Sequence, residues 1–414
     1  MNLGTQIGIL VVKSVVWTLR RIDHHVLGSS ALRTDEVFRD NPYPSFEAIR
    51  HGPIVRSLAN RGWIVLGYEA VQEALRDPNL SNDLNNNPFY LRVARAASGG
   101  MPIPFVDNPP LLNLDPPAHT RLRHAVSRQL TRGYVASLSP LIERSCESLI
   151  ERIALPGDLV ANLAEPLPVQ VIADILGTED TGQLSHWSHR LTNALRIAEP
   201  TQVQDAAEAE ASMRAFIAER LPDMLKRNPR GPIAQLADDP TVNERDLIST
   251  CVLLLTAGHE TTTRLIANTT LMLHRYPKIR DGVVAGQVSI DDVIEEVLRF
   301  EPPVQMTLRF VRHATTIAGR SLKPGQLVLI NFAAANRDRS VFENAEQFRP
   351  GRNQPHLSFG FGIHLCLGAA MARLETRIVM TQLLERFPNY ILPGKINWGD
   401  NPFFRGPATL TFDA

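Results

Sequence analysis

Apolar positions recur at helical spacing over most of the chain, so the sequence predicts a mainly α-helical protein with small β-sheets. The clearest helical patterns cover residues 249–273, 291–300 and 369–380. A series of helices is expected from about 140 to 226, because apolar residues there return every three to four positions. Within that series, residues 167–177 read as a buried helix that ends at its final glycine.

Shorter apolar runs interrupt the helical pattern and predict a minor β component. Residues 54–58 and 63–66 read as strands and precede a helix at 68–76, while 389–412 reads as short strands and turns. Residues 82–114 contain three successive asparagines and five prolines and are expected to be irregular. A loop of this length inside a compact domain is usually functional or disordered.

Composition narrows the class of protein. The chain of 414 residues has 44% hydrophobic and 21% charged residues, which is typical of a globular protein. Basic and acidic residues both number 43, so no overall charge favours binding to nucleic acid. No low-complexity stretch divides the chain, and one domain over residues 36–414 is expected after an N-terminal extension at 1–35. Three cysteines without a C-x-x-C pair favour a reducing, cytoplasmic environment.

The extension contains an apolar segment at residues 3–19, with Lys13 in its middle. The segment is short for a membrane span and lacks the features of a secretory signal. It fits either a helix that lies in a membrane interface, which would give peripheral membrane contact, or a helix packed against the protein itself. Both interpretations stay open.

One ten-residue stretch carries the main chemical signal. It has the pattern Phe-x-x-Gly-x-x-x-Cys-x-Gly at Phe359, Gly362, Cys366 and Gly368, directly before the helix at 369–380. A sulfur at a helix N-terminus faces unpaired N–H groups, which predicts a stabilised thiolate, and glycines let the backbone approach a flat partner. This chemistry suits a thiolate ligand to haem iron. The alternative is a cysteine buried as a small hydrophobic residue.

The stretch resembles the haem-binding loop of the cytochrome P-450 family. This resemblance implies the cytochrome P-450 fold, a triangular helical prism around haem b (iron protoporphyrin IX), with Cys366 as the axial iron ligand. It also implies a bacterial-type haem-thiolate monooxygenase that inserts one atom of dioxygen into an apolar small molecule. The motifs discussed next occur in the family's order from about residue 40 to the end.

The helix at 249–273 is similar to the distal helix of the family. Leu254, Ala257 and Thr261 share one helical face, and small residues on it leave room for a cofactor and a substrate. The resemblance assigns Glu260 and Thr261 as the acid–alcohol pair that supplies protons. By position in the family, residues 183–213 would cover the pocket.

Four basic side chains are expected to bind the haem propionates. His119 and Arg123 lie one helical turn apart, and the resemblance gives this role to them, to Arg309 and to His364. An alternative reading of His364-x-Cys366 as zinc ligands lacks the remaining ligands of a structural zinc site.

The family's Glu-x-x-Arg motif corresponds to Glu296 and Arg299, which are expected to form a buried structural network with Arg352. Several other Glu-x-x-Arg pairs occur in the chain, so the spacing alone is uninformative. The substrate pocket is expected to include residues near the haem edge and a C-terminal phenylalanine: Val304, Gln305, Met306 and Phe403.

No segment of the chain resembles a flavin or iron–sulfur module, so the resemblance implies a separate ferredoxin and ferredoxin reductase as electron donors. Arg373 lies where family members often present a basic patch to a ferredoxin, although a solvated cation is an equal alternative. Two rival functions remain, a peroxide-driven enzyme of the same fold and a non-enzymatic haem carrier or sensor. The Glu260–Thr261 pair argues against the peroxide-driven enzyme.

Overall fold

A computed structural model describes residues 36–414 except 59–60, 99, 194–199 and 400. The predicted extension at 1–35, including the apolar segment 3–19, lies outside the described residues. Within the described ranges, no helix is both long enough and apolar enough to cross a membrane.

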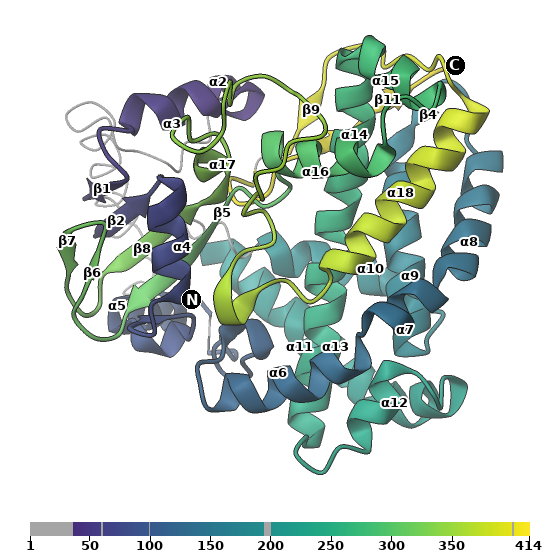
Figure 1. The fold of residues 1–414 in the computed structure, drawn as a ribbon. Helices are drawn as coiled ribbons and strands as arrows, with labels where there is room; N and C mark the ends of the chain where they lie inside the picture. The colour runs from purple at the N-terminus through teal and green to yellow at the C-terminus, as the bar shows by residue number, and fades with distance from the viewer. Residues whose placement is uncertain (1–35, 59–60, 99, 194–199, 400) are drawn as a thin grey trace.

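Helices make up most of the structure, and a smaller sheet region lies to one side of them (Figure 1). This arrangement confirms the predicted mainly α class with small sheets. The helices are α2 (Glu36–Asp40), α3 (Tyr43–Ile49), α4 (Tyr68–Arg76), α5 (Pro88–Ala97), α6 (Ala118–Gln129), α7 (Arg132–Ser137), α8 (Ser139–Glu151), α9 (Pro166–Leu176), α10 (Thr181–Asn193), α11 (Pro200–Arg227), α12 (Pro232–Ala237), α13 (Glu244–Gly258), α14 (Glu260–Arg275), α15 (Pro277–Val284), α16 (Ile290–Phe300), α17 (Phe332–Ala335) and α18 (Ala369–Arg386).

The principal sheet has the strand order β1-β2-β8-β5-β3, in which β2 and β8 are parallel and the other neighbours are antiparallel. Three two-stranded sheets accompany it, and one of them pairs β11 near the C-terminus with β4. The strands are β1 (Ile54–Ser57), β2 (Gly62–Val65), β3 (Leu80–Ser81), β4 (Gly157–Asp158), β5 (Met306–Val311), β6 (Thr315–Ile317), β7 (Arg320–Leu322), β8 (Leu327–Asn331), β9 (Asn397–Trp398), β10 (Pro407–Thr409) and β11 (Thr411–Phe412).

Helix α16 illustrates how the sequence specifies these elements. Asp291 and Asp292 lie in its first turn, where carboxylates face the positive end of the helix dipole, and Arg299 lies in its last turn. Val293 and Val297, one turn apart, are fully buried. The apolar face thus orients α16 toward the core and leaves its acidic N-terminus at the surface.

The largest apolar core holds α14, α16 and α18 together. Leu265 and Ile266 of α14 and Val379 and Leu383 of α18 are almost fully buried in it. Each such side chain contributes about 1.5–3 kcal/mol relative to an exposed one. This packing fixes the start of α18 and the start of α14, and these are the two chain segments that carry the chemical motifs.

Two predictions of secondary structure need correction. Residues 82–114 are not irregular throughout, because α5 forms within them and begins with Pro88 in its first turn. The helix predicted at 249–273 is two helices, α13 and α14, which meet at His259. The other elements agree closely, including α9, which ends at Gly177 in the left-handed conformation.

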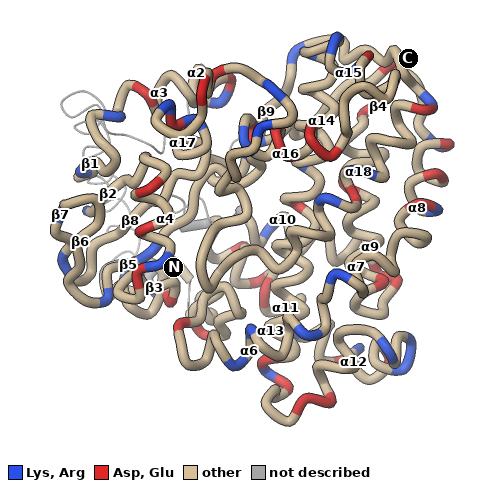
Figure 2. Tube along the Cα trace, viewed as in Figure 1, with Lys and Arg blue, Asp and Glu red and all other residues tan. Residues whose placement is uncertain are grey.

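Charged residues of both signs are interspersed along the chain trace, and none of the elements in view is dominated by one sign (Figure 2). This distribution agrees with the zero net charge of the sequence. The three cysteines, Cys146, Cys251 and Cys366, form no disulfide with one another.

Candidate active site

Cys366 lies in the loop that leads into α18. Its backbone N–H donates to the Phe359 carbonyl at 2.9 Å, which closes the loop around the short 3₁₀ turn Gly362–His364. Gly362 has a φ of +72°, and a Cβ there would lie 2.9 Å from the Leu75 carbonyl oxygen. Glycine is therefore required at this position by the backbone conformation and by contact with α4.

Cys366 is a free thiol that lines a large cavity of the protein. Burial within the protein raises the pKa of its thiol, and the N–H group of Gly368 and the charges of Arg123 and Arg373 offset only part of that effect. The N–H groups at the start of α18 thus favour the thiolate, as predicted, but their effect on the pKa is smaller than that of burial. Coordination to a metal ion would itself deprotonate the thiol.

The cavity has a volume of about 1040 Å³ and lies between the Cys366 loop and the distal helices. Residues on the face predicted from helical spacing, Leu254, Ala257 and Thr261, line this cavity together with Cys366. Val304, Met306 and Phe403 also line it, as predicted.

Gln305 does not line this cavity, which corrects its assignment to the substrate pocket. Its side-chain amide donates to the Pro302 carbonyl at 2.7 Å, and the residue is buried on the other side of the chain from Val304 and Met306. Successive residues of an extended chain point to opposite sides, so these three neighbours could not all face one pocket.

The four predicted propionate ligands gather at one end of the cavity. The rings of His119 and His364 lie 4.2 Å apart, and Arg123 donates to the Leu365 carbonyl at 2.6 Å. Arg309 is buried and donates to the Asn82 amide oxygen at 2.7 Å. Within the described residues, neither Arg123 nor Arg309 has a carboxylate within 4 Å, and the buried His119 has no hydrogen-bond partner on either ring nitrogen.

Burial has the largest effect on the ionisation of this basic group. Burial lowers the pKa of Arg309 to about 10. Burial, followed by the charges of Arg309, His119 and Arg123, lowers the pKa of His364 to about 3. Two carboxylates bound here would compensate the buried charge and satisfy the unpaired donors. The residues therefore fit the propionates of a haem group beside Cys366.

The distal side of the cavity is shaped by the junction of α13 and α14. The Thr261 hydroxyl donates to the Ala257 carbonyl at 3.0 Å, and the Thr262 hydroxyl donates to the Gly258 carbonyl at 3.0 Å. These side-chain bonds compete with the regular helical hydrogen bonds. They lie at the point where α13 ends and α14 begins.

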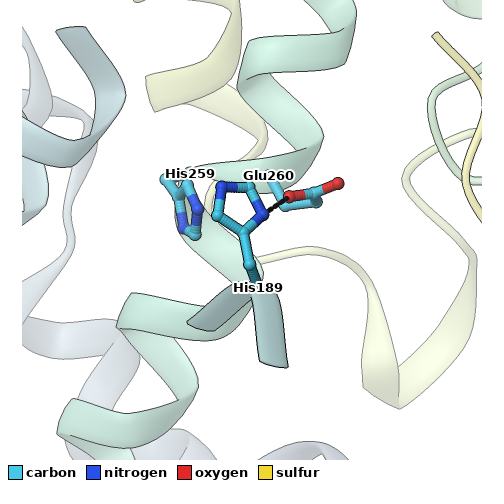
Figure 3. Close-up of side chains that lie close together, drawn as sticks. All are labelled: His189, His259 and Glu260. Carbon is cyan, nitrogen blue, oxygen red and sulfur yellow. Dashed lines mark ion pairs between the residues drawn. The ribbon is translucent and has the colours of Figure 1, made fainter. Parts of the chain in front are cut away.

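Glu260 points away from the cavity, although Thr261 next to it lines the wall. Its carboxylate accepts hydrogen bonds from Arg264 and lies 3.0 Å from Nδ1 of His189 on α10 (Figure 3). Burial alone would raise the pKa of Glu260, but the hydrogen bond with His189 and the charge of Arg264 outweigh it and hold the pKa well below its usual range. Glu260 is therefore an ionised, buried carboxylate.

Sequence analysis missed the partners of Glu260. Arg264 could have been found, since it lies four residues along the same helix. No local sequence pattern predicts the contact between His189 and Glu260, because α10 and α14 come together only in the tertiary structure. Its second nitrogen, Nε2, lies 2.8 Å from the carboxylate of Glu165, a residue that was also missed.

Glu296, Arg299 and Arg352 meet in one buried cluster, as their assignment expected. Arg299 donates through Nε and Nη2 to the two Glu296 oxygens at 2.8 and 2.7 Å, and Arg352 Nε donates at 3.2 Å. The three side chains are at most 3% exposed. Arg299 also donates to the carbonyls of Asn336 and Ala345, so the cluster ties α16 to the segment that precedes the Cys366 loop.

Comparison with known proteins agrees with this site. The Cytochrome P450 family profile matches residues 289–398, which include the Glu296 cluster and the Cys366 loop. Cytochrome P450 monooxygenase PikC of Streptomyces venezuelae is 34% identical over 405 residues, with 93% of each chain covered. Ligand-free CYP164A2 of Mycobacterium smegmatis has a TM-score of 0.83 at 30% identity, covering 97% of this chain and 100% of that one.

A third relative is CYP109E1 of Bacillus megaterium, solved in complex with testosterone. Its TM-score is 0.81 at 29% identity, and the alignment covers 91% of this chain and 99% of that one. Three findings support the same assignment: identity above 30% over nearly the whole length, the shared fold and the geometry of the Cys366 loop. This chain belongs to the cytochrome P450 family and is a monooxygenase of the bacterial type.

Proposed function

We propose that this monooxygenase binds haem b through Cys366 and inserts one oxygen atom into an apolar small molecule, by hydroxylation or epoxidation. Its electrons would come from a separate ferredoxin and ferredoxin reductase. The observation that carries the proposal is that Cys366 and Thr261 line one cavity together with Arg309, a buried arginine, and with His119, whose ring nitrogens are buried and have no hydrogen-bond partner.

Haem b would supply dioxygen binding and redox chemistry, and the chain's own residues would bind and orient it. Cys366 would hold the iron through its thiolate sulfur and donate electron density to it. His119, Arg123, Arg309 and His364 orient the cofactor through its carboxylates. Ala257 leaves the distal wall open, because its side chain is too small to fill the cavity.

Thr261 and Glu260 are assigned to proton delivery. The Thr261 hydroxyl faces the cavity and can turn from the Ala257 carbonyl to donate to a polar group in the pocket. Glu260 is the acidic group next to it in the chain and is held ionised behind the wall. Leu253, Leu254 and Leu265 add apolar side chains to the cavity lining from these helices, which helps to exclude water from the reaction.

The cavity must hold both the cofactor and the substrate. Leu254, Val304, Met306 and Phe403 give it an apolar lining, so recognition of the substrate depends mainly on shape and hydrophobic contact. Terpenoids, steroids, fatty acids and polyketides all match this chemistry. Testosterone is a sensible first probe, because the related CYP109E1 is known in complex with it.

The outer face of the Cys366 loop is proposed as the docking site for the electron donor. Ile363 and Leu365 are 52% and 47% exposed there without lining the cavity, and exposed Arg76 stacks on Phe361. Arg373 contributes less than expected, because it is engaged in a two-point ion pair with Glu295 at 2.6 and 2.9 Å. A small apolar patch with a nearby cation suits an acidic ferredoxin.

The reduced carbon monoxide complex of the haem-loaded protein tests the cofactor assignment. We expect the red-shifted absorption of thiolate-bound iron, lost in Cys366→Ala and retained in the matched variants Cys146→Ala and Cys251→Ala. A normal spectrum for Cys366→Ala would refute the proposal. Ligands that convert the ferric haem from low to high spin would then be tested for oxygenated products with ferredoxin and its reductase.

A further inference from the structure

Two histidines and a glutamate form a cluster where α10 packs on the junction of α13 and α14. One nitrogen of His189, one nitrogen of His259 and one carboxylate oxygen of Glu260 lie within 4.8 Å of one another (Figure 3). None of the three residues lines the cavity that contains Cys366. Imidazole nitrogens together with a carboxylate oxygen are ligands typical of zinc and similar divalent ions. The cluster therefore has the composition of a metal site that is separate from the haem pocket.

His259 has a buried ring nitrogen without a partner. The residue is 2% exposed, and its Nδ1 lies 2.8 Å from the Leu255 carbonyl, so Nδ1 carries a proton. Its Nε2 has no hydrogen-bond partner among the described residues. A charged ring would need an acceptor at Nε2, so the neutral ring is favoured, and its Nε2 is then a buried lone pair without a donor. Metal-binding histidines commonly donate their other N–H group to a carbonyl in this way.

His189 is oriented as a metal ligand would be. Its Nε2 lies 2.8 Å from a carboxylate oxygen of Glu165, which precedes α9, and its Nδ1 lies 3.0 Å from Oε2 of Glu260. A carboxylate on the far nitrogen fixes the ring of many metal-binding histidines and makes the near nitrogen a stronger ligand. Two ligand atoms of a tetrahedral zinc ion lie roughly 3.3 Å apart, since each bond is about 2.0–2.1 Å long. The spacing of Nδ1 and Oε2 is close to this value.

Glu260 has one oxygen for the cluster and one for the rest of the protein. Arg264 donates to Oε1 through Nε at 3.0 Å, which leaves Oε2 on the side of His189. The carboxylates of Glu165 and Glu260 together carry the charge that balances a divalent ion. The side chain of Glu260 is 8% exposed, but that of His189 is 43% exposed, so an ion can reach the cluster from solvent.

We propose that His189, His259 and Glu260 bind one divalent metal ion of the zinc type through Nδ1, Nε2 and Oε2, with water as the fourth ligand. In the metal-free protein Nδ1 of His189 donates a hydrogen bond to Glu260, and this proton passes to solvent when the ion binds. The ion connects α10 to the start of α14. Thr192 of α10 and Thr261 of α14 both line the cavity, so the metal links two of its walls. This site goes beyond the proposed function and does not depend on it.

Zinc content tests the site without turnover. The haem-loaded protein, without an affinity tag, is mixed with a small excess of zinc chloride and dialysed, and zinc is counted per chain by elemental mass spectrometry. We expect one zinc ion per chain in the wild-type protein and in His186→Gln, the matched control, because His186 is an exposed histidine on the same helix. We expect none in His189→Gln or in His259→Gln. Magnesium chloride should not compete, since magnesium prefers oxygen ligands.

Calorimetric titration with zinc chloride separates the ligands from their supporting groups. His189→Gln and His259→Gln should lower the zinc affinity by more than about 100-fold, whereas Glu165→Gln, which alters only the partner of a ligand, should lower it by about 10–100-fold. Far-UV circular dichroism and the spectrum of the reduced carbon monoxide complex verify that each variant is folded. If the buried His259 variant does not fold, the half-exposed His189 variant still provides the test.

Three results would overturn the site. The first is a wild-type chain that retains no zinc, and the second is displacement of zinc by magnesium. The third is one zinc ion per chain in both His189→Gln and His259→Gln, because zinc would then be bound elsewhere. Since zinc is counted per chain and not per iron, the outcome does not depend on the assignment of Cys366 as the haem ligand or on the proton-delivery role of Glu260.

Discussion

Glu296→Gln is the substitution whose cost can be worked out most directly from the structure. Glu296 accepts four hydrogen bonds, from Arg299 Nε and Nη2, from Arg352 Nε and from the backbone N–H of Arg349, at distances between 2.7 and 3.2 Å. Glutamine has nearly the same size and keeps one oxygen as an acceptor. Its NH₂ group, however, would meet a guanidinium N–H as donor against donor, and two buried cations would lose their counter-charge.

Removing one partner of a buried ion pair costs about 3–5 kcal/mol. We expect that loss in the free energy of unfolding, measured by urea titration of the haem-loaded protein with far-UV circular dichroism. We also expect weaker haem retention, since the cluster supports the segment before the Cys366 loop.

Glu346→Gln is the matched control, because Glu346 and Arg349 have the same Glu-x-x-Arg spacing. Glu346 instead pairs at 3.8 Å with Arg339, and both side chains are more than half exposed. Exposed pairs contribute less than about 1 kcal/mol. Equal losses in the two variants would refute the reasoning that burial, and not the motif, gives Glu296 its importance.

Four further predictions concern the site. Thr261→Ala should retain haem but divert electrons to hydrogen peroxide, and undiminished product per electron would contradict its role. Arg309→Leu should weaken haem binding on the order of 10²-fold in a transfer assay, because a buried cation would no longer compensate a propionate. Gly362→Ala should destabilise the loop by about 1–3 kcal/mol in urea titration, since its φ is +72° and its Cβ would crowd Leu75; an unchanged midpoint would exclude this strain. The stabilisation from His189 should be complete below pH 6.5 and vanish toward pH 10, because the folded pKa lies above the unfolded one, and His189→Gln should flatten that part of the stability–pH curve.

Local sequence patterns were sufficient to predict those features that lie within a single helix or loop. The Cys366 loop, the face of Leu254, Ala257 and Thr261, and the buried helix that ends at Gly177 all follow from spacing within a single segment. The error at Gln305 was avoidable, because an extended chain presents alternate residues to a pocket and cannot present three in succession.

The thiolate prediction named an effect that is present but incomplete, for a different reason. It considered the favourable N–H groups at the start of α18 but not the desolvation of a sulfur enclosed by protein, and the desolvation is the larger effect on the Cys366 pKa. The magnitude of desolvation depends on how many chain segments surround the sulfur atom. The local sequence does not specify that number.

The surroundings of Glu260 show the same dependence on tertiary structure most clearly. Glu260 and Arg264 share a helix face, so their ion pair follows from spacing alone. That pair accounts for one oxygen of a buried carboxylate but not for the other. The second oxygen meets His189 only because α10 packs over the α13–α14 junction, where Ser188 also donates to the Leu255 carbonyl at 3.3 Å. This packing places the His189 ring between Glu165 and Glu260, so the ionised state of Glu260 is a property of the assembled helices and not of the acid–alcohol motif alone.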